Sequence, residues 1–312
     1  MALYRNQLPM LGDKLFLTDG GLETTLVFLD GMDLPGFAAF PLLDNGQGRA
    51  RLQHYYREYL DLARAHGCGF VLEAPTWRAN ADWGAVLGYD AARLAAANRR
   101  AIDLLAELRD AYDCPQTPVV ISGNIGPRGD GYRVDAQMNP EQACDYHRGQ
   151  IRVFAASSAD LVSAFTLNYT EEAIGISIAA RAEDIPAVIA FTVETDGRLP
   201  SGESLADAIQ RTDAATGGYP AYYMINCAHP EHFAHLLNER AFPAARIRGL
   251  RANASRRSHA ELDASTDLDA GDPVELGSQY RELRGRLPEL RVLGGCCGTD
   301  FRHVAAISNA CA

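Results

Sequence analysis

The chain has 312 residues, of which 47% are hydrophobic, and no low-complexity stretch divides it, so we expect one domain over residues 1–312 with one large core. The formal net charge of -11 disfavours nucleic acid and anionic membranes as partners, because both bind positive charge. The same charge mildly favours a cationic ligand.

Short apolar runs alternate along the chain with stretches of helical spacing, a pattern typical of a parallel sheet with crossover helices. The eight alternations predict an α/β fold of the (β/α)8 TIM-barrel type, and a doubly wound open sheet is the alternative. The predicted strands are 15–18, 69–72, 119–122, 161–164, 187–191, 222–225, 247–250 and 291–293. The predicted helices are 51–65, 91–112, 140–158, 171–182, 205–215, 231–239, 274–286 and 301–308.

Three polar segments follow predicted strands. Asp19, Gly20 and Gly21 follow the first strand, Cys227 follows the sixth, and a Cys296-Cys297 pair follows the eighth. In a barrel of this type the catalytic groups lie at the carboxyl ends of the strands. These segments are therefore expected on one rim, around one site.

The paired cysteines are the most informative of these features. Neighbouring side chains on a strand point to opposite faces, so Cys296 and Cys297 can bind one ion only where the backbone turns, and the flanking glycines permit that turn. With Cys227 they would offer three thiolates and leave a fourth zinc position open, as catalytic zinc sites do. Buried core cysteines or a vicinal disulfide are the alternatives.

Five motifs carry a resemblance to a known family. They are Leu-Thr-Asp-Gly-Gly-Leu-Glu-Thr at 17–24, Ser-Gly-Asn-Ile-Gly-Pro at 122–127, Asp-Gly-Arg-Leu-Pro-Ser-Gly at 196–202, Ile-Asn-Cys at 225–227 and Gly-Gly-Cys-Cys-Gly-Thr at 294–299. With these motifs the chain resembles the zinc-dependent homocysteine S-methyltransferases, a family that includes betaine-homocysteine methyltransferases and the homocysteine domain of cobalamin-dependent methionine synthase. The last two motifs, in this order, are the most specific.

The resemblance implies a (β/α)8 barrel that holds Zn²⁺ on Cys227, Cys296 and Cys297. It also implies a methyltransferase that moves a methyl group from an onium donor, of the S-methylmethionine or S-adenosylmethionine class, to a thiol. Homocysteine is the first candidate for that thiol, and methionine would be the product. The partners would thus be small molecules.

Two positions depart from the family pattern. A glutamate that helps to hold the amino acid part of homocysteine usually follows strand four, and Phe165 stands there in this chain. After strand two the chain has an acid, Glu73, where the family tends to show threonine or glutamine. Glu73 could replace the missing ammonium contact or meet the positive charge of a donor.

Further candidate substrate contacts lie at the predicted strand ends, each with an ordinary structural alternative. Asp19 could face an amino acid group or cap a turn, and Trp77 could offer its π face to an onium methyl group or simply pack. The remaining candidates are Thr76, Ser122 and Asn124 as hydrogen-bonding groups, Glu194 in an acidic loop, and Asn226 as a group that orients Cys227.

Other interpretations of the sequence stay open. The acceptor or donor could differ from those of the family, or a zinc-bound water could make the protein a metallohydrolase, although an all-sulfur ligand set is unusual for that class. A structural zinc or a redox-active cysteine pair would be non-enzymatic. The polar stretch 253–272 reads equally well as a lid or as a plain loop.

The seven cysteines are an odd number in a long chain, unlike the dense even sets of small secreted domains. The first residues lack a charged segment followed by an apolar one, and no run approaches membrane-spanning length. We therefore predict a soluble cytoplasmic protein. The sequence does not indicate its oligomeric state.

Overall fold

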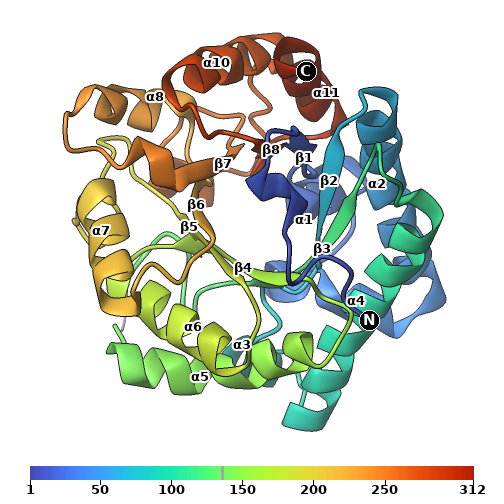
Figure 1. The fold of residues 1–312 in the computed structure, drawn as a ribbon. Coiled ribbons are helices and arrows are strands. Elements are labelled where there is room, and N and C mark those ends of the chain that lie inside the picture. The colour runs from blue at the N-terminus through green and yellow to red at the C-terminus, as the bar shows by residue number, and fades with distance from the viewer. Residues whose placement is uncertain (135–136) are drawn as a thin grey trace.

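The computed structural model describes residues 1–134 and 137–312. Its eight strands all pair in parallel, each with the next along the chain, and β8 pairs with β1 to close the barrel. Figure 1 looks along the barrel and shows the helices as an outer ring around the strands. The predicted (β/α)8 barrel is confirmed, and the doubly wound alternative is excluded by the closure.

Every predicted strand is present, with its ends moved by a few residues at most. The strands are β1 (Phe16–Leu17), β2 (Gly69–Glu73), β3 (Val119–Ile125), β4 (Leu161–Leu167), β5 (Ala187–Phe191), β6 (Tyr222–Asn226), β7 (Ile247–Ala252) and β8 (Val292–Gly295).

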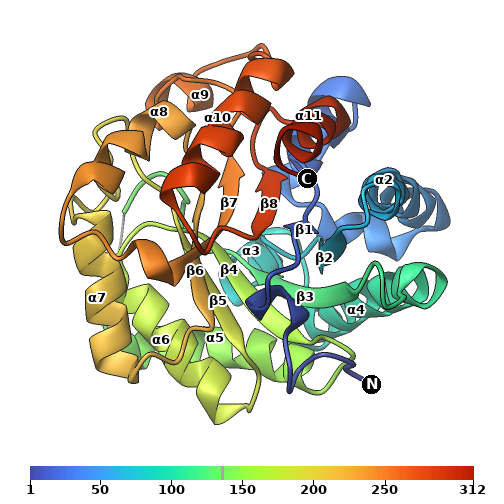
Figure 2. The same cartoon turned by 45° about the horizontal axis from the view of Figure 1, so that its top comes forward.

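Seven of the eight predicted helices are also present, and most begin at a capping residue or a first-turn proline. The large outer helices are α2 (Gly46–Ala65), α4 (Ala91–Tyr112), α5 (Pro140–Ala155), α6 (Thr170–Ala182), α7 (Leu205–Thr216), α10 (Pro273–Arg286) and α11 (Phe301–Cys311). Figure 2 shows α10 and α11 side by side next to β7 and β8.

Within the described residues, three short α-helices were not predicted, and one predicted helix is broken. The unpredicted helices are α1 (Leu22–Thr24), α3 (Ala81–Val86) and α9 (His259–Asp263), and α9 lies inside the predicted loop 253–272. The expected helix 231–239 is instead α8 (Pro230–Phe233) followed by a 3-10 turn. The backbone of Phe233 leaves the helical region there, with φ -128°.

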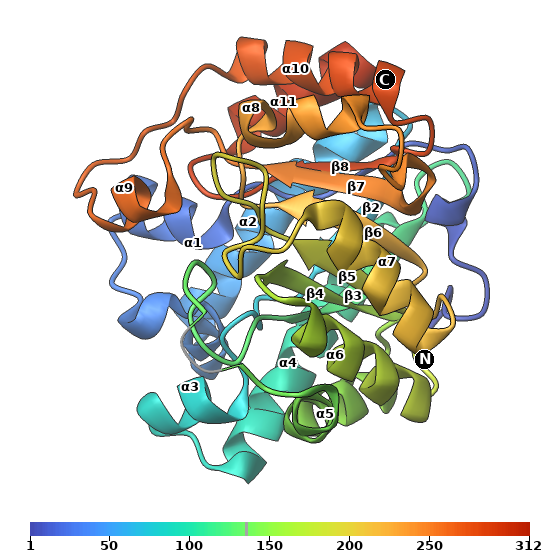
Figure 3. The same ribbon diagram turned by 90° about the vertical axis from the view of Figure 1, so that its left-hand side faces the viewer.

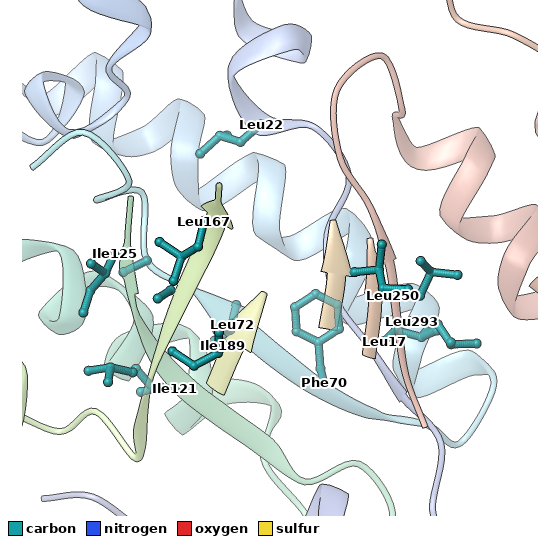
Figure 4. Close-up of a cluster of buried hydrophobic side chains, with 14 of the residues drawn as sticks. Leu17, Leu22, Phe70, Leu72, Ile121, Ile125, Leu167, Ile189, Leu250 and Leu293 are labelled. Atoms are coloured by element: carbon teal, nitrogen blue, oxygen red, sulfur yellow. The ribbon is translucent and has the colours of Figure 1, made fainter. Parts of the chain in front are cut away.

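The strands are buried on both faces, so their inward and outward side chains form two separate apolar layers. Outward residues such as Leu17, Leu72 and Ile121 pack under the helices in one large cluster, which Figure 4 shows in part. Inward residues such as Val71 and Val120 form a second cluster inside the barrel. The N-terminal segment adds Met10 to this inner cluster.

The two ends of the barrel differ in what covers them. Figure 3 shows α1, α3 and α9 beyond the end toward which the strands point, and the N-terminus near the opposite end. The chain therefore concentrates its added loops and short helices on the rim where the sequence predicted the site. None of the helices in the described part of the chain combines the length and apolar character needed to cross a membrane.

Candidate functional site

The three predicted metal ligands meet at the carboxyl end of the barrel. The Sγ atoms of Cys227, Cys296 and Cys297 all lie within 4.8 Å of one another. The Cys227 and Cys297 sulfurs are 3.5 Å apart, far beyond the S–S bond length of about 2.0 Å. All three cysteines are free, so the vicinal disulfide is absent from this structure.

The backbone of the two strand ends makes this convergence possible. Cys227 follows β6 in a left-handed conformation, φ 55°, which residues with a Cβ seldom adopt. Behind the paired cysteines, a Cβ on Gly294 would lie 2.0 Å from the Thr18 Oγ1 atom, and one on Gly295 would lie 2.1 Å from the Thr299 Oγ1 atom. Glycine at 294 therefore lets β8 end close against the end of β1, and glycine at 295 leaves room for Thr299 in the turn after the cysteines.

The side chain of Asn226 lies between the cysteines and β4. The Asn226 amide holds β4 through two 2.9 Å hydrogen bonds with Thr166, accepting from its backbone N–H and donating to its hydroxyl. The same amide nitrogen lies 3.9 Å from the Cys296 sulfur. Asn226 thus lies beside the cysteines and joins them to β4.

A tyrosine and a histidine cover the sulfurs from above. The Tyr132 hydroxyl lies 2.9 Å from the Cys227 sulfur and 3.5 Å from the Cys297 sulfur. Its ring stacks on His259 with centroids 4.0 Å apart. His259 in turn hydrogen-bonds the Cys227 carbonyl at 2.8 Å and the Glu194 carboxylate at 2.9 Å. The loop after β3 and the loop after β7 therefore meet over the cysteines.

The three neighbouring thiols change one another's pKa through hydrogen bonds. Hydrogen bonds from Cys227 and Cys297 lower the pKa of Cys296 well below its ordinary value, and the Arg251 guanidinium adds to that effect. Hydrogen bonding to Cys296 and Cys297 raises the pKa of Cys227 well above its ordinary value, with help from burial. One negative charge is therefore easily formed here, and further charges require a cation close by.

This donor set fits a divalent zinc ion. Three sulfurs within bonding range of a common point match the thiolate ligands that zinc prefers, and three protein ligands leave one position for a substrate. A bound dication would offset the hydrogen bonding and burial that otherwise raise the pKa of Cys227.

A cavity of about 380 Å³ opens beside the sulfurs. Among the described residues, it is walled by seven acidic side chains and two arginines, together with aromatic rings that include Trp77, Tyr132 and Phe165. The acids are Asp19, Glu23, Glu73, Asp130, Asp263, Asp267 and Asp269, and the arginines are Arg78 and Arg251. The cavity therefore carries an excess of negative charge.

One ion pair neutralises part of that charge. Arg251, on β7, donates from Nη1 to Asp19 at 2.9 Å and from Nη2 to the Gly20 carbonyl at 2.9 Å. The Tyr55 hydroxyl donates to the other Asp19 oxygen at 3.0 Å. Both charged side chains are nearly fully buried. Asp19 therefore lines the cavity but is already paired with a cationic side chain.

The predicted substrate contacts divide into two groups. Thr76, Ser122 and Glu194 do not line the cavity: Thr76 donates to the Asn124 carbonyl, Ser122 to the Ser163 hydroxyl, and Glu194 binds His259. The residues that do line it are Asp19, Gly20, Gly21, Glu73, Trp77, Asn124, Phe165 and Asn226, together with the three cysteines.

Sequence reasoning missed Tyr132, Arg251 and His259. Arg251 was detectable, because it is a charged residue on the inward face of an apolar strand, two positions beyond Gly249. Tyr132 carries only a weak signal, its place in a glycine-rich loop. His259 carries no signal, since it reaches the site from a loop whose length does not constrain its path.

The structure is a closed barrel with a cluster of three cysteines at one rim, and the sequence comparison assigns its family. The homocysteine S-methyltransferase pattern matches residues 16–311. The chain therefore belongs to the homocysteine S-methyltransferase family and is a methyltransferase of that family.

Individual relatives are distant. The chain is similar to "Homocysteine S-methyltransferase 1" of Arabidopsis thaliana, with 22% identity over 94% of this chain and 92% of that protein. Its fold is similar to crystal structures of the homocysteine methyltransferase MmuM from Escherichia coli. The metallated form gives a TM-score of 0.76 at 21% identity, covering 98% of this chain and 99% of that one. The oxidized form gives 0.74 at 22% identity, with the same coverage of both chains.

Proposed function

We propose that this protein transfers a methyl group from an onium donor, of the S-methylmethionine or S-adenosylmethionine class, to homocysteine, and that it does so with Zn²⁺. The observation that carries the proposal is the cluster of Cys227, Cys296 and Cys297 sulfurs within 4.8 Å of one another beside an acidic cavity. Family membership gives the reaction class, and the acidic side chains of the cavity wall favour a positively charged donor.

Cys227, Cys296 and Cys297 would hold the zinc. When bound, the ion lowers the pKa of a substrate thiol, so that the thiolate, which is the reactive nucleophile, exists at neutral pH. Arg251 lies against the same cluster, and its charge already lowers the pKa of Cys296. Negative charge on sulfur is therefore stabilised in this corner of the cavity even before a substrate enters.

The rest of the cavity suits a positively charged donor. Asp130 and Asp263 stand on its wall, and the Trp77 ring also lies on it. The Arg78 guanidinium stacks over that ring, 4.2 Å from its centroid, and an aromatic ring attracts onium methyl groups in the same way. The Trp77 indole N–H donates to the Phe165 carbonyl at 3.2 Å, which fixes the ring in place. The acids would raise the local concentration of a cation and disfavour an anionic donor.

The reaction itself destroys charge. The carbon–sulfur or carbon–nitrogen bond of the donor breaks, the methyl group forms a new bond to the acceptor sulfur, and the donor leaves as a neutral thioether or amine. A cavity that holds both reactants close and dry favours such a step. The cover formed by Tyr132 and His259 over the sulfurs would serve that exclusion of water.

The test is an incubation of zinc-loaded protein with homocysteine and a panel of methylated sulfonium and ammonium compounds, with methionine measured by mass. Transfer from at least one donor is the expected result. The same assay with the Cys297→Ser variant should give no methionine. Absence of transfer from every donor in the panel would contradict the proposal.

A further inference from the structure

Glu73 is a buried carboxylate with unused hydrogen-bonding capacity. It is the last residue of β2, and because side chains alternate along a strand it points inward like Val71. Only 4% of the residue is exposed. Its Oε1 atom accepts a 3.1 Å hydrogen bond from the Ser163 hydroxyl, which in turn accepts from Ser122. Its Oε2 atom is buried and has no hydrogen-bond partner among the described residues.

A buried carboxylate oxygen without a hydrogen-bond partner costs free energy unless a bound ligand supplies the missing partner. Burial raises the pKa of Glu73 to about 7, and an unpaired buried carboxylate normally destabilises a fold. The Ser163 hydroxyl fixes the position of one oxygen and leaves the other without a partner, in a side chain that forms part of the cavity wall. The geometry is that of a prepared site for a cation.

The neighbouring acids do not share this property. Asp19 is already paired with Arg251 and hydrogen-bonded to Tyr55. Glu23 also lines the cavity, but it is only partly buried. Glu73 is thus the one deeply buried acid of the cavity wall, within the described residues, that keeps an unpartnered oxygen.

Arg251 lines the same cavity and carries the opposite charge to Glu73. Three of its five N–H groups are engaged, by the Gly295 carbonyl, Asp19 and the Gly20 carbonyl. Two remain for a ligand. The guanidinium lies 5.2 Å from the centre of the Phe165 ring, and its charge acts on both Glu73 and Cys296. The Glu73 carboxylate, the Arg251 guanidinium and the cysteine sulfurs therefore all line the same cavity.

We infer that Glu73 binds the α-ammonium group of the acceptor amino acid and that the free N–H groups of Arg251 bind its carboxylate. The inference rests on the proposed function for the identity of the acceptor as an α-amino thiol. An amino acid thiol has one charge of each sign beside its sulfur, and the floor presents the two complementary charges beside the cysteines.

We assign Glu73 and Arg251 to the acceptor rather than to the donor because both residues lie deep in the cavity. The acceptor sulfur must reach the cysteine cluster, and the donor must approach that sulfur from the opposite side, which is the open mouth. The mouth has acids of its own, among them the exposed Asp263 and Asp267. Glu73 and Arg251, both more than nine-tenths buried, lie on the acceptor's side.

The experiment compares three thiols as acceptors for the zinc-loaded protein, with the best onium donor. The thiols are homocysteine, 4-mercaptobutyrate, which lacks the ammonium group, and 3-mercaptopropylamine, which lacks the carboxylate. Glu73→Gln should raise KM about 10- to 100-fold for the two ammonium-bearing thiols, the range of a lost charged hydrogen bond. It should leave KM for 4-mercaptobutyrate within about 2-fold. Glu58→Gln, on the exposed face of α2, is the matched control.

Equal losses on all three thiols, or no loss on any, would overturn the inference. Calorimetric titration of homocysteine into the zinc-loaded protein gives a second measurement that does not depend on turnover. If the wild type binds homocysteine about 10-fold or more tightly than Glu73→Gln but transfers no methyl group, the proposed function fails and the assignment of Glu73 stands. If the wild type does not bind homocysteine, the assignment of Glu73 fails.

Discussion

At Cys227 a single backbone conformation decides whether the three sulfurs can meet. Its φ of 55° turns the chain out of β6 at a cost of about 1 kcal/mol or more for a residue with a Cβ. Strain of this kind persists where the surroundings hold it, and here the carbonyl of Cys227 accepts hydrogen bonds from His259 and Thr192. The conformation directs the sulfur toward Cys297 and Tyr132.

The first prediction concerns the metal ligands. Cys297→Ser should reduce bound zinc from about one per chain to well below one, because a serine hydroxyl is a much poorer zinc ligand than a thiolate. Elemental analysis after reconstitution measures this. Cys144→Ser, at a cysteine on α5 outside the cluster, should keep full zinc content. Equal zinc in both variants would contradict the assignment.

The second prediction concerns Glu73 and pH. Its folded pKa of about 7 lies above the ordinary value of 4.5, so the folded state holds a proton that the unfolded state has lost between those values. The stability that this proton contributes is present below about pH 4.5 and disappears as the pH rises through 7.

Glu73→Gln removes this titration. The free energy of unfolding of the metal-free variant, relative to wild type, should therefore improve between pH 5 and pH 8 by roughly 2.5 kcal/mol. Denaturant unfolding at the two pH values measures it, with Glu58→Gln as the unaffected control. If the free energy of unfolding of Glu73→Gln differed from that of wild type by the same amount at both pH values, the pKa of Glu73 would not be raised.

At the residue scale, then, part of the site was visible in the sequence. The cysteines were found because adjacent thiols between glycines are rare and chemically specific. The contacts of Thr76, Ser122 and Glu194 could not be foreseen, since a polar residue at a strand end can face either the cavity or a neighbouring strand. Which one it faces depends on side-chain contacts that no local pattern encodes.

At the scale of elements, pairs of glycines let β1 and β8 end close together. Gly20 and Gly21 follow β1, and Gly294 and Gly295 end β8. A Cβ on Gly21 would lie 2.5 Å from the Cys296 carbonyl oxygen and 2.4 Å from the Thr24 hydroxyl, so neither neighbour leaves room for a methyl group. The chain between β1 and α1 is therefore packed directly against the cysteine turn, and a change in one should disturb the other.

Gly21→Ala should accordingly destabilise the protein by about 1–3 kcal/mol, the usual cost of overpacking, and also weaken zinc binding. Gly149→Ala is the comparison, because Gly149 lies within α5 with nothing within 4 Å of its added Cβ. That change should stabilise the protein by about 0.5–1 kcal/mol, as alanine is the better helix former. Thermal unfolding and zinc titration of both variants measure these effects. If Gly21→Ala left zinc affinity intact, the coupling between the two turns would be refuted.

The elements themselves were the most predictable part of the molecule. Each strand of a barrel is buried on both sides, so it appears as a short apolar run, and all eight runs were found. The break after Phe233 and the small helix α9 were not, because both depend on contacts made by the loop after β7. His232 on α8, for instance, hydrogen-bonds the Arg256 carbonyl of that loop at 2.9 Å.

At the scale of the whole molecule, the proposed zinc would join distant parts of the chain. Cys227 follows β6 and the cysteine pair follows β8, so one ion would link two strand ends that are separated in the sheet by β7. A ligand that binds only the folded state stabilises it by mass action. Metal binding and barrel stability should therefore be coupled.

We expect zinc at 100 times its dissociation constant to stabilise the protein by about 2.7 kcal/mol, a rise in Tm of about 5 °C for a chain of this size. A chelator should reverse the rise, and Cys297→Ser should show neither response. Thermal scans with and without zinc decide the matter. A wild type whose Tm ignores zinc would indicate that the cluster does not bind the ion in the folded state.

The most direct test of the account counts the sulfurs around the bound zinc by X-ray absorption, before and after homocysteine is added. We expect three sulfurs in the protein alone, from Cys227, Cys296 and Cys297, and four once the acceptor thiol is bound. A count that stays at three when homocysteine saturates the protein, or that never reaches three, would contradict it.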